Sequence, residues 1–309
     1  MTAQYLLHGL VIESELRLPA RSPDERAPPQ LRVVLGGPPP GPEAPGEGEI
    51  VAEMPAYGYA AVRNGDILRC WFSDLAEFAI NTANAEVRVG ISPGCDRELA
   101  SLLLAGTVLS LVLALRHETV LHASAVRHQG MTLAFVGDEG RGKSTLATLL
   151  CADGAELVTD DVLRFEVKGN DVHWYSGTNE LRLRRQAWPL ASNLPYPSSP
   201  TSDGRLRLDL ASRCAPTRGK LDAIILPRPD TALTQLESRV VSAPDALLAL
   251  AFSPRLRGLC DIPALRRQFH ALGALVRRVP VLDVALPWGP PFAEQLSAEL
   301  CAVARAGSR

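Results

Sequence analysis

The chain has 309 residues, which at roughly 150 residues per domain suggests two domains or one large one. Hydrophobic residues make up 46% and charged residues 21%, as in ordinary soluble globular proteins. The formal net charge is −2, so the chain lacks the basic surplus of a dedicated nucleic-acid-binding protein or of a polybasic membrane anchor, and we expect neither kind of partner.

The first 95 residues favour strands. Apolar, strand-like stretches cover 5–12, 31–35, 57–63, 67–72 and 86–91, and Asn64-Gly65 is a typical hairpin turn. Residues 22–48 contain eight prolines and five glycines, a composition that interrupts strands and predicts a surface loop around the short strand 31–35. We therefore predict a small β-rich N-terminal domain over residues 1–95.

An uncharged apolar run follows, from Leu99 to Leu115. It is shorter than the roughly 20 residues that span a bilayer, and Asp96 is placed to cap its start. We interpret it as a buried core helix and expect no membrane span. The first residues show no basic segment followed by an apolar core, so they do not resemble a signal peptide.

The six cysteines are scattered, with no CxxC pair. This pattern favours free thiols in a reducing cytosol over a disulfide scaffold or a zinc site, and a cytoplasmic location is expected.

Strands and helices alternate in the rest of the chain, which predicts an α/β domain over residues 96–309. A buried strand at 132–136 precedes a glycine-rich loop and a helix that Gly154 closes. Further strands are predicted at 157–159, 163–167, 172–175, 221–226 and 281–286, and an amphipathic helix at 292–303.

The glycine-rich loop fits the phosphate-loop pattern GxxxxGK[ST] between Gly137 and Ser144. Glycines let successive backbone N–H groups turn toward an anion, and the positive end of the following helix points at the same charge. Lys143 would reach the terminal phosphates and the Ser144 hydroxyl would hold Mg²⁺. The expected nucleotide-binding residues are Gly137, Asp138, Glu139, Gly140, Arg141, Gly142, Lys143, Ser144 and Thr145.

Asp160 and Asp161 end the next apolar strand. Two adjacent carboxylates repel each other unless a cation or a substrate proton is nearby, so one could bind a metal while the other takes a hydroxyl proton. The alternative is a polar turn that begins the following hairpin.

Three segments taken together resemble the catalytic domain of HPr kinase/phosphorylase: Leu121-His-Ala-Ser-Ala, the phosphate loop, and Leu157-Val-Thr-Asp-Asp. The resemblance covers about residues 118–210. It implies a P-loop kinase core of the HPr kinase/phosphoenolpyruvate-carboxykinase type behind the β-rich N-terminal domain. The opening segment YLLHGLVIESELRLP is similar to shorter HPr-kinase-related proteins, some of which phosphorylate a serine of a lasso-peptide precursor.

The resemblance also implies roles for single residues. His122 would assist at the phosphate and the acceptor, Asp160 would be the general base, and Asp161 would lie toward the metal. Glu139 departs from the family pattern, which has a small hydroxyl residue there, and its charge would repel phosphates unless it faces outward or helps to hold the cation.

A second element, Glu180-Leu-Arg182, resembles a Glu-Ile-Arg element in which the acid lies near the metal and the arginine near the transferred phosphoryl group. A solvated edge strand is the alternative for this stretch. Arg205, together with Arg207, could supply an arginine clamp from a loop.

These observations favour a Mg²⁺-dependent kinase that moves the γ-phosphoryl group of ATP or GTP to a serine of a peptide or small protein. The resemblance also admits a homo-oligomer, since the family often forms rings. A transporter-type ATPase and a nucleotide-binding regulatory module remain alternatives, although no LSGGQ-like signature is present.

Overall fold

The computed structural model describes residues 2–192 and 194–307 as a mixed α/β protein with several sheets. Its contacts divide the chain into two compact units. The first comprises Met1–Glu118 and Arg255–Arg267, and the second comprises Thr119–Pro254 and Gln268–Arg309. The helical run after residue 96 thus belongs to the first unit, whereas the sequence assigned it to the second part of the chain.

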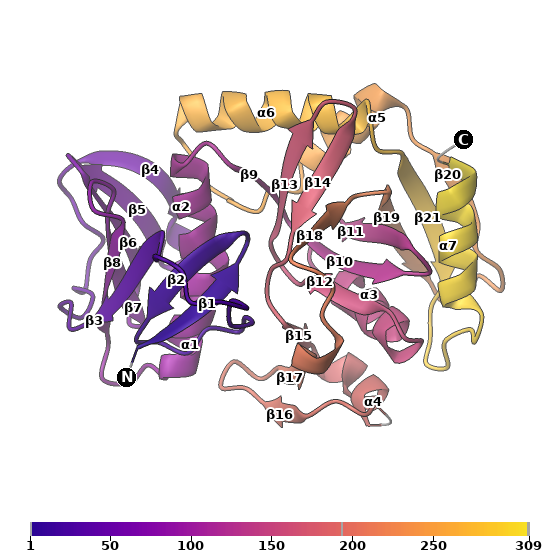
Figure 1. Ribbon diagram of the computed structural model, residues 1–309, viewed down its shortest axis with the longest axis horizontal. Helices are drawn as coiled ribbons and strands as arrows, with labels where there is room; N and C mark the ends of the chain where they lie inside the picture. The colour runs from indigo at the N-terminus through magenta and orange to yellow at the C-terminus, as the bar shows by residue number, and fades with distance from the viewer. Residues whose placement is uncertain (1, 193, 308–309) are drawn as a thin grey trace. The chain divides into compact units, whose positions relative to one another are not determined.

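An eight-stranded sheet forms most of the first unit (Figure 1), in the order β1-β2-β3-β8-β7-β6-β5-β4. Neighbouring strands are antiparallel, except that β3 is parallel to both β2 and β8. The strands are β1 (Ala3–Leu7), β2 (Leu10–Ser14), β3 (Leu31–Leu35), β4 (Glu49–Met54), β5 (Tyr59–Asn64), β6 (Ile67–Phe72), β7 (Ala76–Asn81) and β8 (Glu86–Ile91). A short 3-10 turn, Pro55–Tyr57, precedes β5.

The expected β-rich character is present, but two details differ. The stretch 5–12 is not one strand, because His8 and Gly9 both adopt positive φ and turn the chain into the hairpin β1–β2. The strands β4 and β7 were not predicted. The proline-rich segment after β3 is a largely exposed loop, as expected, and the Trp71 indole donates a hydrogen bond to its Gly41 carbonyl at 2.9 Å.

The apolar run forms α1 (Arg97–Leu103) and α2 (Leu109–Leu115), joined by a π-helical turn at Leu104–Val108. The Asp96 side chain caps α1 by accepting from the Glu98 N–H at 3.1 Å. By length and composition this helical run could cross a membrane, but 61% of its most apolar stretch is buried inside the protein. Its burial matches the core helix of a soluble protein, and the expected core helix is confirmed.

Three sheets form the second unit. The central one has the order β12-β10-β11-β19-β21-β20, a second has β18-β14-β13-β9, and a third has β15-β17-β16. Their strands are β9 (Thr119–Leu121), β10 (Ala123–His128), β11 (Met131–Val136), β12 (Glu156–Thr159), β13 (Leu163–Lys168), β14 (Asp171–Tyr175), β15 (Glu180–Leu183), β16 (Ser198–Pro200), β17 (Leu206–Asp209), β18 (Arg218–Lys220), β19 (Ala223–Asp230), β20 (Glu237–Val240) and β21 (Val281–Pro287).

The helices of this part of the chain are α3 (Lys143–Ala152), α4 (Trp188–Ala191), α5 (Ala243–Ala251), α6 (Ile262–Val276) and α7 (Leu296–Gly307), with 3-10 turns at Arg185–Ala187 and Ala211–Arg213. The predicted strands at 132–136, 157–159, 163–167, 172–175 and 281–286 are all present, within a few residues at each end. The C-terminal helix begins at Leu296 rather than at Phe292.

Alternation along β11 fixes the two faces of the central sheet. Leu133 and Phe135 pack into a core with residues of α3 and α7, whereas Ala134 and Val136 pack into a second core with residues of β13, β14 and α6. Both faces of the sheet are therefore covered by apolar side chains. Polar side chains can gather where the strands end and the loops leave the sheet.

Candidate phosphate-binding site

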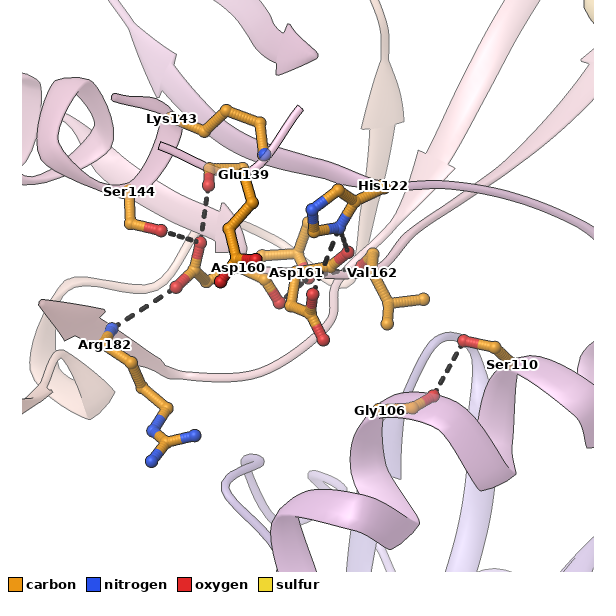
Figure 2. A network of polar contacts seen from close by, with 12 residues as sticks. Gly106, Ser110, His122, Glu139, Lys143, Ser144, Asp160, Asp161, Val162 and Arg182 are labelled. Carbon is orange, nitrogen blue, oxygen red and sulfur yellow. Dashed lines mark hydrogen bonds and ion pairs between the residues drawn. The ribbon is translucent and has the colours of Figure 1, made fainter. Parts of the chain in front are cut away.

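The topology of the central sheet brings three distant segments to one edge. β10 is antiparallel to both β11 and β12, so the start of β10 lies beside the ends of β11 and β12. His122 directly precedes β10, the glycine-rich loop follows β11, and Asp160 and Asp161 follow β12. The segments whose order carried the family resemblance therefore meet in one place (Figure 2).

The loop between β11 and α3 curves around the side-chain ammonium group of Lys143. Gly140 and Gly142 have φ values of +85° and +81°, in the left-handed region that favours glycine. Lys143 begins α3, and its Nζ donates to the carbonyl oxygens of Gly137 at 2.7 Å and Asp138 at 3.0 Å. The ammonium is thus held inside the curve of the loop. Burial lowers the pKa of Lys143, and nearby carboxylates, Asp160 foremost, oppose that shift.

Other members of the predicted loop set lie around this lysine. Arg141 is exposed, and Thr145 lies half-buried in the first turn of α3.

Asp160 is buried and receives three hydrogen bonds. Its Oδ1 accepts from the Ser124 hydroxyl at 2.5 Å and the Ser144 hydroxyl at 2.9 Å, and its Oδ2 accepts from the Arg182 N–H at 3.3 Å. Burial raises the pKa of Asp160, and these donors oppose the shift by stabilising the carboxylate. The carboxylate is therefore tied both to the phosphate-loop serine and to β15.

Asp161 lies in a different environment from its neighbour. Its side chain is 48% exposed, and its φ of +73° turns the chain away from the line of β12. The His122 Nδ1 lies 3.1 Å from the Asp161 Oδ1 and 3.1 Å from the Asp161 carbonyl oxygen. Both partners are oxygen acceptors, so these contacts are hydrogen bonds in the tautomer that carries its proton on Nδ1. His122 thus orients an accessible carboxylate (Figure 2).

The element Glu180-Leu-Arg182 forms β15, whose Leu181 and Leu183 are buried in the core. The alternation of a strand places Glu180 and Arg182 on its other side. The Glu180 residue is buried, with 7% of its surface exposed. The Arg182 Nη2 donates to the Asp203 carboxylate at 2.5 Å and to the Thr201 hydroxyl at 3.2 Å.

Glu139, the residue that departs from the family pattern, is paired with two arginines. Its Oε1 accepts from the Arg184 guanidinium, and the Arg205 Nη2 lies 3.6 Å from the same oxygen. Arg205 also lies 3.6 Å from Asp203, which binds Arg182. Positive and negative side chains therefore alternate from Glu139 through Arg205 and Asp203 to Arg182 of β15. The negative charge of Glu139 is balanced by its arginine partners.

Sequence reasoning did not identify three polar residues of this network: Ser124, Thr201 and Asp203. Ser124 could have been found, because it lies two residues after His122, inside the segment that carries the family resemblance.

The oxygen atoms at the start of α3 fit a magnesium ion. Ser144 Oγ and Asp160 Oδ1, 2.9 Å apart, are hard ligands of the kind that Mg²⁺ prefers. Among residues 2–192 and 194–307, no three His, Cys, Asp or Glu side chains gather as a metal cage. Such a cage is not required, since Mg²⁺ at nucleotide sites takes one or two protein oxygens and completes its shell with phosphate and water.

Comparison with solved structures gives a likeness to a kinase/phosphatase. The solved structure of the Hpr(Ser) kinase/phosphatase from Coxiella burnetii matches with 13% sequence identity and a TM-score of 0.32, covering 60% of this chain and 94% of that one. No protein-family model matches the sequence, and no curated protein matches it. The function proposed below therefore rests on the geometry of the site.

Proposed function

We propose that this protein is a Mg²⁺-dependent kinase that transfers the γ-phosphoryl group of ATP or GTP to a serine hydroxyl of a peptide or small protein. One observation carries the proposal: the two adjacent carboxylates differ in what they contact. Asp160 is buried against Ser144, and Asp161 is accessible and oriented by His122. Hydrolysis and transfer both need a metal site and a group that orients the nucleophile, and an exposed carboxylate can also receive a serine on a bulky acceptor.

This geometry supports exchanging the roles that the family resemblance implied for the pair. Asp160 shares its Oδ1 with the Ser144 hydroxyl, so it is the better candidate for the metal side. Asp161 has the exposure that a bulky acceptor requires, and its histidine partner fixes the direction of its carboxylate. We therefore assign the proton-accepting role to Asp161 and the metal-holding role to Asp160 with Ser144.

In the proposed reaction, Asp161 takes the proton from the serine hydroxyl as the serine oxygen bonds to the γ-phosphorus. The bond between that phosphorus and the β–γ bridging oxygen breaks, and the nucleoside diphosphate leaves. Lys143 neutralises charge on the terminal phosphates from inside the loop. A magnesium ion held by Ser144 and Asp160 would supply further charge neutralisation when bound.

The arginines near the loop complete the proposal. The Arg184 and Arg205 guanidinium groups converge from two segments on Glu139 of the phosphate loop, where guanidinium groups can bind phosphate oxygens in pairs. The Arg182 guanidinium binds Asp203, which also lies near Arg205, so a phosphoryl role for Arg182 requires its side chain to leave Asp203. A cytoplasmic location and a peptide acceptor, including the precursor of a peptide natural product, belong to the same proposal. So do the metal role of Glu180 and a homo-oligomeric state.

The direct test is to incubate the purified protein with radiolabelled ATP or GTP, Mg²⁺ and a library of serine-containing peptides, with matched peptides carrying alanine in place of serine as the control. We expect label on serine peptides only, and none in excess chelator. Release of inorganic phosphate without a labelled peptide would indicate a hydrolase instead. Nucleotide binding without any turnover would indicate a regulatory module.

A further inference from the structure

A tryptophan lies against the start of the phosphate-loop helix. The ring of Trp288 is so close to Gly142 that a Cβ atom on this glycine would lie 2.4 Å from the Cη2 atom of the indole. Gly142 directly precedes Lys143, so the benzo edge of the indole borders the loop expected to hold the phosphates. Only glycine at 142 permits this approach.

The position of Trp288 follows from the central sheet. It comes directly after β21, which is parallel to β19, and β19 is parallel to β11. The carboxyl ends of these three strands therefore share one edge, and ligands of open α/β sheets bind outside the carboxyl ends of the strands. The Trp288 backbone N–H donates to the Asp230 carbonyl at the end of β19 at 3.0 Å, which fixes the backbone there.

The indole is also held from the side. Its ring meets the Phe292 ring edge-on, at 88° and with centroids 5.1 Å apart. Trp288 is partly buried against the core that contains α3, so part of it stays accessible at the edge of the sheet. An aromatic side chain on a fixed backbone, held by a ring contact and packed against Gly142, is preorganised to receive a flat partner.

We infer that Trp288, supported by Phe292, binds the base of the nucleotide by stacking, while the loop binds its phosphates. This inference rests on the proposed function, because it presumes that a nucleotide occupies the loop. A flat aromatic base is the part of a nucleotide that would gain from an indole, and stacking on an aromatic side chain tolerates more than one base. The contact adds affinity without selecting strongly between adenine and guanine.

The test compares two probes that share their phosphates and differ in the base. Dissociation constants for ATP and for inorganic tripolyphosphate, each with Mg²⁺, are measured on the wild type, Trp288→Ala and Trp288→Phe. Trp188→Phe is the matched control, since Trp188 packs against the same core and its indole donates to the Leu183 carbonyl. We expect Trp288→Ala to lower the affinity for ATP about 5- to 100-fold and to leave the affinity for tripolyphosphate unchanged. Trp288→Phe should retain part of the ATP affinity.

Each other outcome decides against the inference. If Trp288→Ala weakens both probes equally, the indole only supports the loop. If neither affinity changes, the base binds elsewhere. If Trp288→Ala fails to fold, the fluorescence of the wild type and of Trp288→Phe still decides. Stacking requires that ATP quench the part of the indole emission that is missing in Trp288→Phe. It also requires that tripolyphosphate leave that emission unchanged. A wild type that binds neither probe would instead overturn the proposed function.

Discussion

Replacing each member of the carboxylate pair by asparagine separates their roles. Asp161→Asn removes a charge and a proton acceptor while keeping the shape, and asparagine tolerates the left-handed backbone at this position, where φ is +73°. Loss of a general base slows transfer by roughly 10²–10⁴-fold. The affinity for Mg²⁺-nucleotide should stay nearly unchanged, since Ser144 and Asp160 are intact.

Asp160→Asn should behave differently. The carboxylate accepts from two hydroxyls through Oδ1 and from the Arg182 N–H through Oδ2. With its oxygen toward the hydroxyls, the asparagine places its NH₂ group against the Arg182 N–H, so one buried hydrogen bond is lost. That loss lowers the stability of the folded protein. An uncharged amide oxygen is also a weaker Mg²⁺ ligand than a carboxylate, so the affinity for Mg²⁺-nucleotide should fall roughly tenfold or more, and added Mg²⁺ should partly restore the rate.

Both variants are compared by titrating nucleotide at several Mg²⁺ concentrations and then measuring phosphate transfer in a single turnover at saturation. Thermal unfolding of each variant checks that it is folded. The reasoning is refuted if Asp161→Asn transfers at the wild-type rate. It is also refuted if Asp160→Asn keeps its metal-nucleotide affinity and loses only the transfer step, since Asp160 would then be the base.

Three further changes test the loop. Lys143→Ala should lower nucleotide affinity roughly tenfold or more and abolish transfer without unfolding the protein, as checked by calorimetry and circular dichroism; normal affinity and rate would contradict the phosphate-loop assignment. Gly142→Ala should destabilise the protein more than Gly140→Ala in thermal unfolding, because both glycines have positive φ but only a Cβ at 142 meets Trp288; equal destabilisation would contradict the contact. Glu139→Gln should change stability by less than about 0.5 kcal/mol and tighten nucleotide binding a few-fold, because it frees two arginines and removes a negative charge beside the phosphates; weaker binding would show that Glu139 positions its arginines for the ligand.

Short-range features of the site were visible in the sequence. The glycines, Lys143 and Ser144 follow one another in a fixed pattern, and Asp160 and Asp161 end an apolar strand, so local rules sufficed to predict the loop and the acidic pair. The grouping of His122 with them needed the family resemblance, because it depends on β10 lying between β11 and β12. Pairings between distant strands are not encoded in any local pattern.

The residues that sequence reasoning missed are those defined by distant contacts. Nothing near Trp288 in the sequence indicates that its ring touches Gly142, and the role of Glu139 depends on arginines from β15 and from the loop before β17. Within the N-terminal unit, His8 and Gly9 broke a predicted strand because a hairpin turn can form inside an apolar stretch, and local apolar content does not reveal it.

The fold itself explains how two identical neighbours come to lie in different environments. Asp160 continues the line of β12, and its backbone N–H and carbonyl both bond the Thr178 hydroxyl, which fixes its side chain toward the core and Ser144. The chain then reverses within one residue, since the Val162 N–H donates to the Asp160 carbonyl at 3.0 Å and Asp161 takes the positive φ that this turn requires. Its carboxylate is thereby directed to solvent beside His122. Acid–base roles of paired carboxylates are set by such differences in environment, and the proposed peptide acceptor would reach only the exposed one.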